Sequence, residues 1–392
     1  MMAPRVHITE ECLREGMQIE SAQITVEQKL ELLDALSRTG LRHIVVGAFV
    51  SPRFTPQMAD IDELVRRLVP VPGVRYSALT LNERGRERAR AWMPPLSETG
   101  EPPSTLVHLC DTFVRRNVNV SRAQEVAAWP DTIASAASAG AQRAGIGVGA
   151  VFGSNFSGLA DLDEALELLD LQRQLWAGAG IPPDTVWLGD PMGWCTPRRT
   201  RELITLVRGR LPEIRHFYLH LHDSRGLALA SSYAAIEALD ERCELYLDTT
   251  AGGIGGCPYC GNGRATGLAP TEDLVNLLEE MGIPTGVDLE RLIEAVWLLE
   301  RILGRATNGH VSKAGPPPRG KRRYDPNLPV IETLAEARHF NLGAAVTDPG
   351  RRPWRAPIPD PPSETALSEA RRLNPAIEPR RLNPAAHPGA QS

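Results

Sequence analysis

The sequence has few of the features that mark several common protein classes. Among its 392 residues there are only six cysteines, and aromatic side chains make up 5%. Lysine and arginine number 43 against 48 aspartates and glutamates, which leaves a formal net charge of −5. A chain of this charge has no basic field to attract a phosphate backbone. We therefore expect no nucleic-acid partner.

Long hydrophobic runs are also missing. No apolar stretch approaches the roughly 20 residues that a membrane-spanning helix needs, and the first residues contain no apolar segment typical of a secretory signal. Cysteines scattered through a long chain favour reduced thiols over a disulfide framework. With 42% hydrophobic residues the chain can still bury a large core. We expect a cytoplasmic protein with no membrane partner.

Short apolar runs alternate with amphipathic segments along most of the chain. The runs predict eight strands, each followed by a helix, at residues 6–9, 43–46, 76–81, 105–109, 144–152, 185–188, 217–221 and 245–247. Eight such units in succession favour a (β/α)8 TIM barrel, an α/β fold. A doubly wound open sheet is the alternative. The barrel is preferred because polar clusters follow nearly every strand, and in a barrel those loops share one face.

The composition changes near residue 283. We predict a barrel over residues 1–305, followed by a helical or irregular extension over residues 306–392 that is rich in proline and arginine. The extension repeats the sequence Arg-Arg-Leu-Asn-Pro-Ala at residues 371–376 and 380–385. Such polar, proline-rich sequence is typical of disordered or draped chain. An arm that contacts another subunit is the alternative.

Two histidines near the end of the seventh predicted strand are the first candidates for chemistry. Residues 217–221 are apolar and aromatic apart from His220, as in a buried strand, and His222 follows directly. Residues i and i+2 of a strand point to the same face, so both imidazoles project together. Two imidazoles on one face can bind a divalent metal. The alternative is a pair of polar histidines that line the core.

The loop after the first strand is the second candidate. It contains Glu10, Arg14, Glu15 and Gln18. A carboxylate here can supply a hard oxygen ligand to a metal held by imidazoles, and the fixed N–H donors of Arg14 can hold an oxyanion. On spacing alone, a solvated charged loop is the more common explanation of such a stretch.

A glycine-rich loop follows the eighth strand at residues 252–263. It is too flexible for a packed element and is suited to a lid over a site. Cys257 and Cys260 form a C-x-x-C pair, but no second pair completes a zinc ribbon. We interpret Cys257 as an acid/base or lid thiol and Cys260 as incidental. The glycines do not form a nucleotide-binding fingerprint.

Taken together, several stretches resemble the 3-hydroxy-3-methylglutaryl-CoA lyases and the wider metal-dependent barrels of the pyruvate-carboxyltransferase type. They occur in the family's order over about residues 5–305. The matching stretches are Arg14–Gln18, Phe49–Arg53, Pro56–Asp60, Thr112–Asn117, Leu188–Asp190, His220–Asp223, Gly255–Tyr259 and Thr271–Val275. The resemblance implies a TIM barrel with a divalent metal at the C-terminal end of its strands.

The resemblance implies that Glu15, His220 and His222 bind this metal, with Mg²⁺ or Mn²⁺ expected and Zn²⁺ as the alternative. The family's further ligand is an asparagine after the glycine-rich loop. Leu268 stands at that position here, and Asn262 or water is expected to replace it.

Two more departures from the family pattern concern acidic residues. Glu15 replaces the family's aspartate and is one methylene longer, and Val45 stands where the lyases carry an acidic residue on the second strand. Both departures affect the prediction of the substrate, and neither affects the prediction of a barrel fold.

Five residues match catalytic positions of the family: Glu10, Arg14, Gln18, Asp190 and Cys257. The implied reaction is carbon–carbon cleavage of a 3-hydroxy acyl thioester. Arg14 is expected to stabilise the enolate that leaves, and Cys257 to protonate it. His220, Asp190 or a water on the metal are the alternatives for the base.

Two other functions remain open at this point. One is a Claisen-type condensation of an acyl-CoA with a 2-oxo acid, and the other is a binding barrel without activity. The partner is then a small-molecule acyl thioester or 2-oxo acid. Because family members commonly form dimers, the resemblance also implies a homodimer.

Overall fold

The protein is described from a computed structural model. The structure describes residues 3–98, 100–260, 267–320, 323, 364, 368, 371 and 372. The chain separates into two compact units, Met1–Ser312 and Lys313–Ser392. Most of the predicted extension, including both copies of its repeat except Arg371 and Arg372, lies outside the described residues, so the predictions for it stay predictions.

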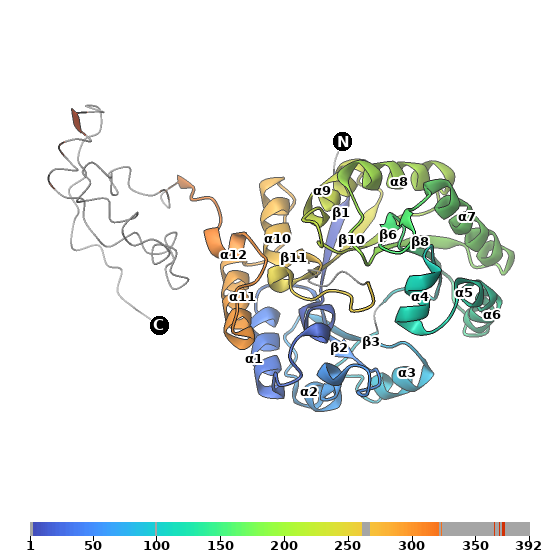
Figure 1. The fold of residues 1–392 in the computed structure, drawn as a ribbon, viewed down its shortest axis with the longest axis horizontal. Coiled ribbons are helices and arrows are strands. Elements are labelled where there is room, and N and C mark those ends of the chain that lie inside the picture. Colours follow the sequence, from blue (N-terminus) through green and yellow to red (C-terminus); the bar gives the residue numbers. More distant parts are fainter. Residues whose placement is uncertain are drawn as a thin grey trace. The chain divides into compact units, whose positions relative to one another are not determined.

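The first unit contains a curled sheet of parallel strands with helices on its outer side (Figure 1). All eight predicted strands are present. They are β1 (Arg5–Glu10), β2 (His43–Ala48), β3 (Arg75–Leu79), β4 (Ser104–His108), β5 (Ala144–Gly149), β8 (Pro183–Asp190), β9 (His216–Leu221) and β10 (Glu244–Thr250).

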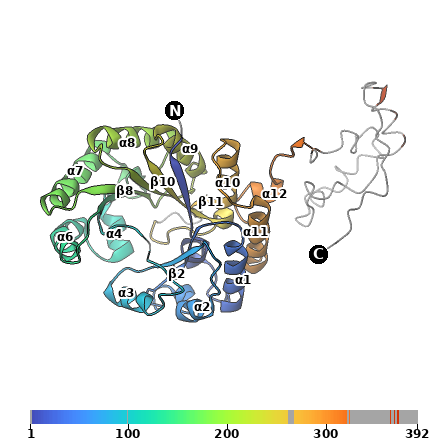
Figure 2. The same ribbon diagram turned by 180° about the vertical axis from the view of Figure 1, so that it is seen from behind.

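The spatial order of these strands is β3-β2-β1-β10-β9-β8-β5-β4. The first and the last predicted strands, β1 and β10, are therefore neighbours, paired in parallel from Arg5↔Glu244 to Glu10↔Thr249. An open doubly wound sheet would not bring its terminal strands together in this way. The barrel prediction is confirmed, although within the described residues no backbone pairing joins β3 to β4. The view from behind shows the same curled arrangement (Figure 2).

The helices follow the strands, as the sequence pattern predicts. They are α1 (Val26–Ser37), α2 (Ile61–Arg67), α3 (Glu83–Arg90), α4 (Asp111–Val118), α5 (Arg122–Ala127), α6 (Trp129–Ser138), α7 (Leu162–Gly178), α8 (Pro197–Arg210), α9 (Ala228–Ala238), α10 (Thr271–Glu280), α11 (Leu289–Leu303) and α12 (Val311–Ala314). Thr25 and Ser121 form capping boxes with Gln28 and Gln124, which explains where α1 and α5 begin.

The loop after β1 differs from the prediction, because it is helical. Residues Cys12–Gly16 form one wide turn in which the amide of Gly16 donates to the carbonyl of Glu11 at 3.1 Å. A tighter turn, Met17–Ile19, follows. Five-residue hydrogen bonds of this kind are rare and have no strong sequence signal, and they often occur at functional sites.

The strand alternation decides which side chains enter the site. In β9, Phe217, Leu219 and Leu221 are buried in the hydrophobic core. The alternate side chains, those of His216, Tyr218 and His220, therefore lie on the opposite face of the strand, toward the barrel interior. The core thus holds β9 in the one register that leaves His220 inside the barrel.

No helix in the described part of the chain has the length and apolar character needed to cross a membrane.

Candidate metal centre and acidic cluster

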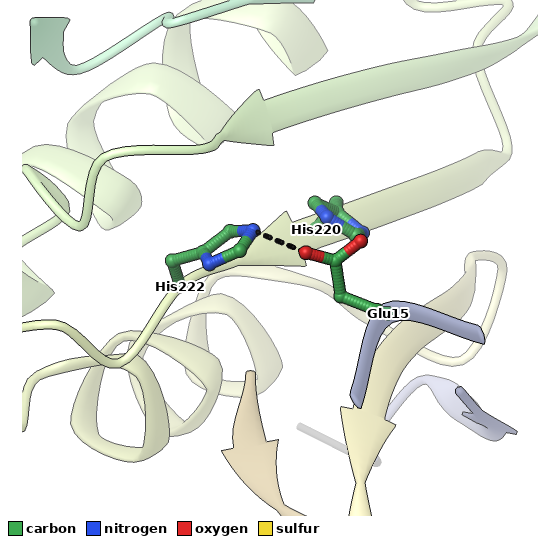
Figure 3. Close-up of side chains that lie close together, drawn as sticks. All are labelled: Glu15, His220 and His222. Atoms are coloured by element: carbon green, nitrogen blue, oxygen red, sulfur yellow. Dashed lines mark ion pairs between the residues drawn. The ribbon is translucent and has the colours of Figure 1, made fainter. Parts of the chain in front are cut away.

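The end of strand β9 and the turn after β1 bring three predicted residues together. His220 lies near the end of β9, His222 directly follows that strand, and Glu15 lies in the wide turn after β1. The Glu15 carboxylate points toward the two imidazoles (Figure 3). Because β10 separates β1 from β9, only a curled sheet brings this turn over the two histidines.

The three side chains form a compact set of possible ligands. Glu15 Oε1 lies 3.6 Å from Nε2 of His222, and one ligand atom from each residue falls within 4.8 Å of the others. The two imidazole rings are 5.2 Å apart between centroids. All three residues are buried, and Glu15 Oε1 has no hydrogen-bond partner within the described residues. A buried carboxylate oxygen without a donor, facing two imidazoles, fits a divalent cation.

The protonation states also fit a metal. Burial works against ionisation of Glu15, yet Arg14 and His222 hold the pKa of its carboxyl below the usual range. Burial lowers the pKa of His220 more than the nearby carboxylates of Glu11 and Glu15 raise it. Glu15 is therefore ionised and His220 neutral near pH 7, the forms in which both bind metals.

Arg14 lies between two carboxylates. Its Nη1 makes a close ion pair with Glu15 and lies 3.2 Å from Oε2 of Glu11. Burial alone would lower the pKa of Arg14, but these two carboxylates raise it above its usual value. The guanidinium therefore stays charged in a site largely shielded from water, where a fixed cation interacts strongly with a developing anion.

Two acidic residues of this site were not identified from the sequence. Asp248, in β10, lies 2.9 Å from Nδ1 of His220 through its Oδ2, and Glu11 joins these two in a second cluster with ligand atoms within 4.8 Å. Burial raises the pKa of both Glu11 and Asp248 to about 7. Asp248 lies one residue beyond the eighth predicted strand, and continuing the alternation of that strand was the available signal for it. Glu11 lies within the loop already considered, but the resemblance assigned it no role.

Two predicted catalytic carboxyl groups are held by backbone amides. Glu10 accepts hydrogen bonds from the amides of Cys12 and Ala251 at 2.8 and 3.0 Å and from the hydroxyl of Thr271 at 2.5 Å. Burial raises the pKa of Glu10 to about 7. These contacts join β1 to the start of the glycine-rich loop and to α10, so they give Glu10 a structural function in addition to any catalytic one.

The other such carboxyl group is that of Asp190 at the end of β8. It accepts from the amides of Trp194 and Cys195 at 2.9 and 2.6 Å, and burial raises its pKa. Gln18 hydrogen-bonds the Glu15 carboxylate and so helps to orient it. The catalytic roles expected for Asp190 and Gln18 stay predictions.

The glycine-rich loop begins in contact with the turn that carries Glu15. Gly255 has a φ of +100°, and a Cβ added to it would lie 2.5 Å from the backbone oxygen of Glu15. Only glycine allows this approach. Cys257 lies two residues after Gly255, is half-buried, and interacts electrostatically with Arg14.

Cys260 is fully buried, and its thiol donates to the carbonyl of Pro191 at 2.9 Å. A hydrogen bond with Cys257 and burial raise the pKa of the Cys260 thiol far above its usual value. It is thus a protonated thiol at neutral pH, and the incidental role expected for it stays a prediction.

Two of the positions involved in the departures from the family pattern, Leu268 and Val45, are described by the structure, and the third, Asn262, is not. Asn262 lies outside the described residues, so its predicted ligand role stays a prediction. Leu268 is fully buried and forms an isolated antiparallel bridge with His222, so this position lies beside a candidate ligand but its side chain offers no ligand atom. Val45 is a buried residue of β2.

The fold and the site together define a class: a TIM barrel that gathers a carboxylate and two imidazoles at the C-terminal ends of its strands, where enzymes of this fold place their active sites. The HMGL-like family matches residues 5–298. The chain belongs to this family of divalent-metal-dependent barrels.

Named relatives agree with this membership. The chain is 35% identical over 303 residues to hydroxymethylglutaryl-CoA lyase of Pseudomonas mevalonii, covering 77% of this chain and 93% of the relative. It is 32% identical over 310 residues to 3-hydroxy-3-isohexenylglutaryl-CoA/hydroxymethylglutaryl-CoA lyase of Pseudomonas aeruginosa, covering 79% and 97%. The crystal structure of Bacillus subtilis HMG-CoA lyase matches with a TM-score of 0.66 at 28% identity, covering 80% and 99%.

The raised pKa values of Glu11 and Asp248 make metal binding dependent on pH. Both carboxyls bind protons in the metal-free protein up to about pH 7, and a nearby cation favours their ionised forms. We expect the dissociation constant for Mn²⁺ to fall between pH 5.5 and 7.5, by about tenfold per pH unit for each proton displaced. Isothermal titration calorimetry in buffers of different ionisation enthalpy would measure both the affinity and the protons released. An affinity that does not change across this range would contradict the assignment.

Proposed function

We propose that this protein is a carbon–carbon lyase that cleaves 3-hydroxy-3-methylglutaryl-CoA or a closely similar 3-hydroxy acyl thioester. The observation that carries the proposal is the buried set of Glu15, His220 and His222 beside the charged Arg14. Membership of the HMGL-like family, and relatives named for this reaction, support it. The name of the Pseudomonas aeruginosa relative includes a longer 3-substituent, so substrates that differ at this position are candidates.

Glu15, His220 and His222 would hold a divalent cation, which supplies Lewis-acid polarisation of the substrate's hydroxyl and carboxylate oxygens. One carboxylate oxygen and two imidazole nitrogens suit Mg²⁺ or Mn²⁺, and Zn²⁺ is the alternative. The side chain of Leu268 offers no ligand atom, so Asn262, substrate oxygens or water would supply the remaining ligands.

The remaining groups act on the organic fragment. When the bond between carbons 2 and 3 breaks, its electron pair moves to the thioester side and forms an enolate, while the 3-hydroxyl loses its proton and becomes a ketone. The charged guanidinium of Arg14 stabilises the enolate oxygen. The thiol of Cys257 then protonates carbon 2, which releases an acetyl thioester and a 3-oxo acid. Asp190 and His220 are the candidate side chains for taking the hydroxyl proton.

The expected cellular setting follows from the same features. All six cysteines are free, which supports a reducing compartment and the predicted cytoplasmic location. The homodimer implied by the resemblance and the boundary between residues 305 and 306 stay predictions.

The decisive experiment compares cleavage with condensation in one preparation. The purified chain is stripped with a chelator, reconstituted with Mg²⁺, Mn²⁺ or Zn²⁺, and given 3-hydroxy-3-methylglutaryl-CoA and longer 3-substituted analogues. Liquid chromatography of acetyl-CoA detects cleavage. A parallel incubation of acetyl-CoA with a panel of 2-oxo acids, followed by free-thiol release, detects condensation. Full cleavage activity after exhaustive chelation would exclude the metal-dependent lyase, and thiol release without cleavage would favour the condensing enzyme.

The ligand set can be tested with a matched pair of histidine variants. His222→Ala removes a buried member of the set and should weaken Mn²⁺ binding by at least about 10-fold to 100-fold. His216 begins β9, the strand that His222 follows, and lies beside Tyr246 away from the ligand set, so His216→Ala should keep the wild-type affinity. Calorimetric titration of both variants gives the comparison. Equal affinity in the two variants would show that His222 is not a ligand.

The proposed acid has an internal control in the second cysteine. Cys257→Ser should bind Mn²⁺ normally but lower kcat by about 10²- to 10⁴-fold, because a hydroxyl is a much weaker acid than a thiol. Cys260→Ser keeps a hydroxyl that can donate to the Pro191 carbonyl and contact Cys257, so it should lose far less activity than Cys257→Ser. Steady-state cleavage assays measure both variants. A fully active Cys257→Ser variant would remove this residue from the mechanism.

Position 268 allows a gain-of-binding test. Leu268→Asn places an amide oxygen beside His222, where it can add a fourth ligand, although replacing a fully buried leucine costs stability. Leu268→Ala makes the same cavity without the ligand. We expect tighter Mn²⁺ binding in the asparagine variant than in the alanine variant, measured at matched fractions of folded protein. Weaker or equal binding would mean that this side chain does not reach the ion.

A further inference from the structure

Asp248 hydrogen-bonds a histidine of the ligand set through its carboxylate. Its Oδ2 lies 2.9 Å from Nδ1 of His220, and both side chains are largely buried, with 15% and 11% of their surfaces exposed. The two residues lie on neighbouring parallel strands, one step beyond the registered pair Leu247↔Leu219. The contact is thus built into the sheet and does not depend on a loop.

The surroundings of His220 leave its ring little freedom. On the side away from the strand ends, Tyr218 and Tyr246 stack with centroids 4.1 Å apart and an interplanar angle of 1°, and they continue the same two rows of inward-facing side chains. The Trp187 ring lies 6.1 Å from that of His220 across the next strand. Asp248 is itself tied to β1 through a hydrogen bond with the side chain of Thr9.

We propose that Asp248 is the positioning residue of the metal centre: it accepts the Nδ1 proton of His220, fixes the imidazole in that tautomer, and directs Nε2 toward Glu15 and His222. A carboxylate that accepts from the second nitrogen of a ligating histidine fixes the ring and makes it a better donor to the metal. The inference rests on the metal-dependent function proposed above and concerns a residue that the resemblance did not assign.

The arrangement also bears on the reaction. A histidine that donates from Nδ1 to Asp248 and offers Nε2 to a cation has no lone pair left to accept a proton. Of the two candidate side chains, His220 is therefore a ligand and an unsuitable base. The hydroxyl proton of the substrate must go to another acceptor, either Asp190 or solvent.

The position of Glu11 allows another explanation of the contact between Asp248 and His220, namely a second metal site. Glu11, His220 and Asp248 together have ligand atoms within 4.8 Å of one another, so they could hold a second cation in place of a hydrogen bond. The distance favours the positioning role, because Nδ1 of His220 and Oδ2 of Asp248 are at normal hydrogen-bond distance.

The test compares Asp248→Asn with a control on the same strand, Glu244→Gln. Asparagine keeps the size of the side chain but removes its charge and can turn its amide to favour either tautomer of His220. Glu244 lies at the opposite end of β10 and contacts His7 and Tyr246. Calorimetric titration with Mn²⁺ should give one ion per wild-type chain, a dissociation constant about 10- to 100-fold weaker for Asp248→Asn, and an unchanged constant for Glu244→Gln.

A second readout does not involve the metal at all. In metal-free protein labelled with ¹⁵N-histidine and kept well above pH 7, where the Asp248 carboxyl is ionised, long-range ¹H–¹⁵N spectra should show His220, assigned by its loss in His220→Gln, with its proton on Nδ1. In Asp248→Asn the signal should shift toward the Nε2–H form.

The outcomes separate the two proposals. Wild-type protein that binds no divalent ion would overturn the proposed function itself. Wild-type protein that binds one ion, with an Asp248→Asn variant of equal affinity and unchanged tautomer, would overturn the role of Asp248 and leave the lyase standing. Two ions per wild-type chain, one of them lost in Asp248→Asn, would show that Asp248 is a ligand.

Discussion

The structure of this site depends on how buried negative charge is balanced. Glu11, Glu15 and Asp248 meet around the single guanidinium of Arg14, and when all three carboxyls are ionised two negative charges remain. Charges held away from water must be neutralised by protons or by counter-ions. A bound cation would reduce the negative charge that remains. The acidity of the site, its histidines and its expected metal are therefore parts of one electrostatic arrangement.

Much of the fold followed from periodicity alone. Alternating apolar and polar residues mark the eight strands, and threonine or serine caps such as Thr25 mark where helices begin. The wide turn of Cys12–Gly16 did not follow, because its hydrogen bond closes over five residues and has no propensity signal of its own. The start of α4 has no clear sequence signal either, since its N-cap is the sulfur of Cys110, a weak acceptor that capping rules do not include.

The site was predictable where a local pattern or a resemblance pointed to it, and less so where its residues meet only in three dimensions. The i, i+2 spacing of His220 and His222 is by itself enough to place them on one face of a strand. Asp248 is distant in sequence and reaches His220 only because β9 and β10 are paired in a particular register. The amide contacts of Glu10 show the limit of a resemblance, which identifies the position but not its three hydrogen bonds.

The contact between Gly255 and Glu15 couples the glycine-rich loop to the wide turn after β1. Since there is space for only a hydrogen atom between the loop and the backbone of the turn, neither segment can shift inward without displacing the other. A movement of the loop that carries Cys257 toward or away from a substrate would therefore also displace the backbone of Glu15. Substitutions at residue 255 should accordingly be selected against as strongly as those at the acidic residue it touches.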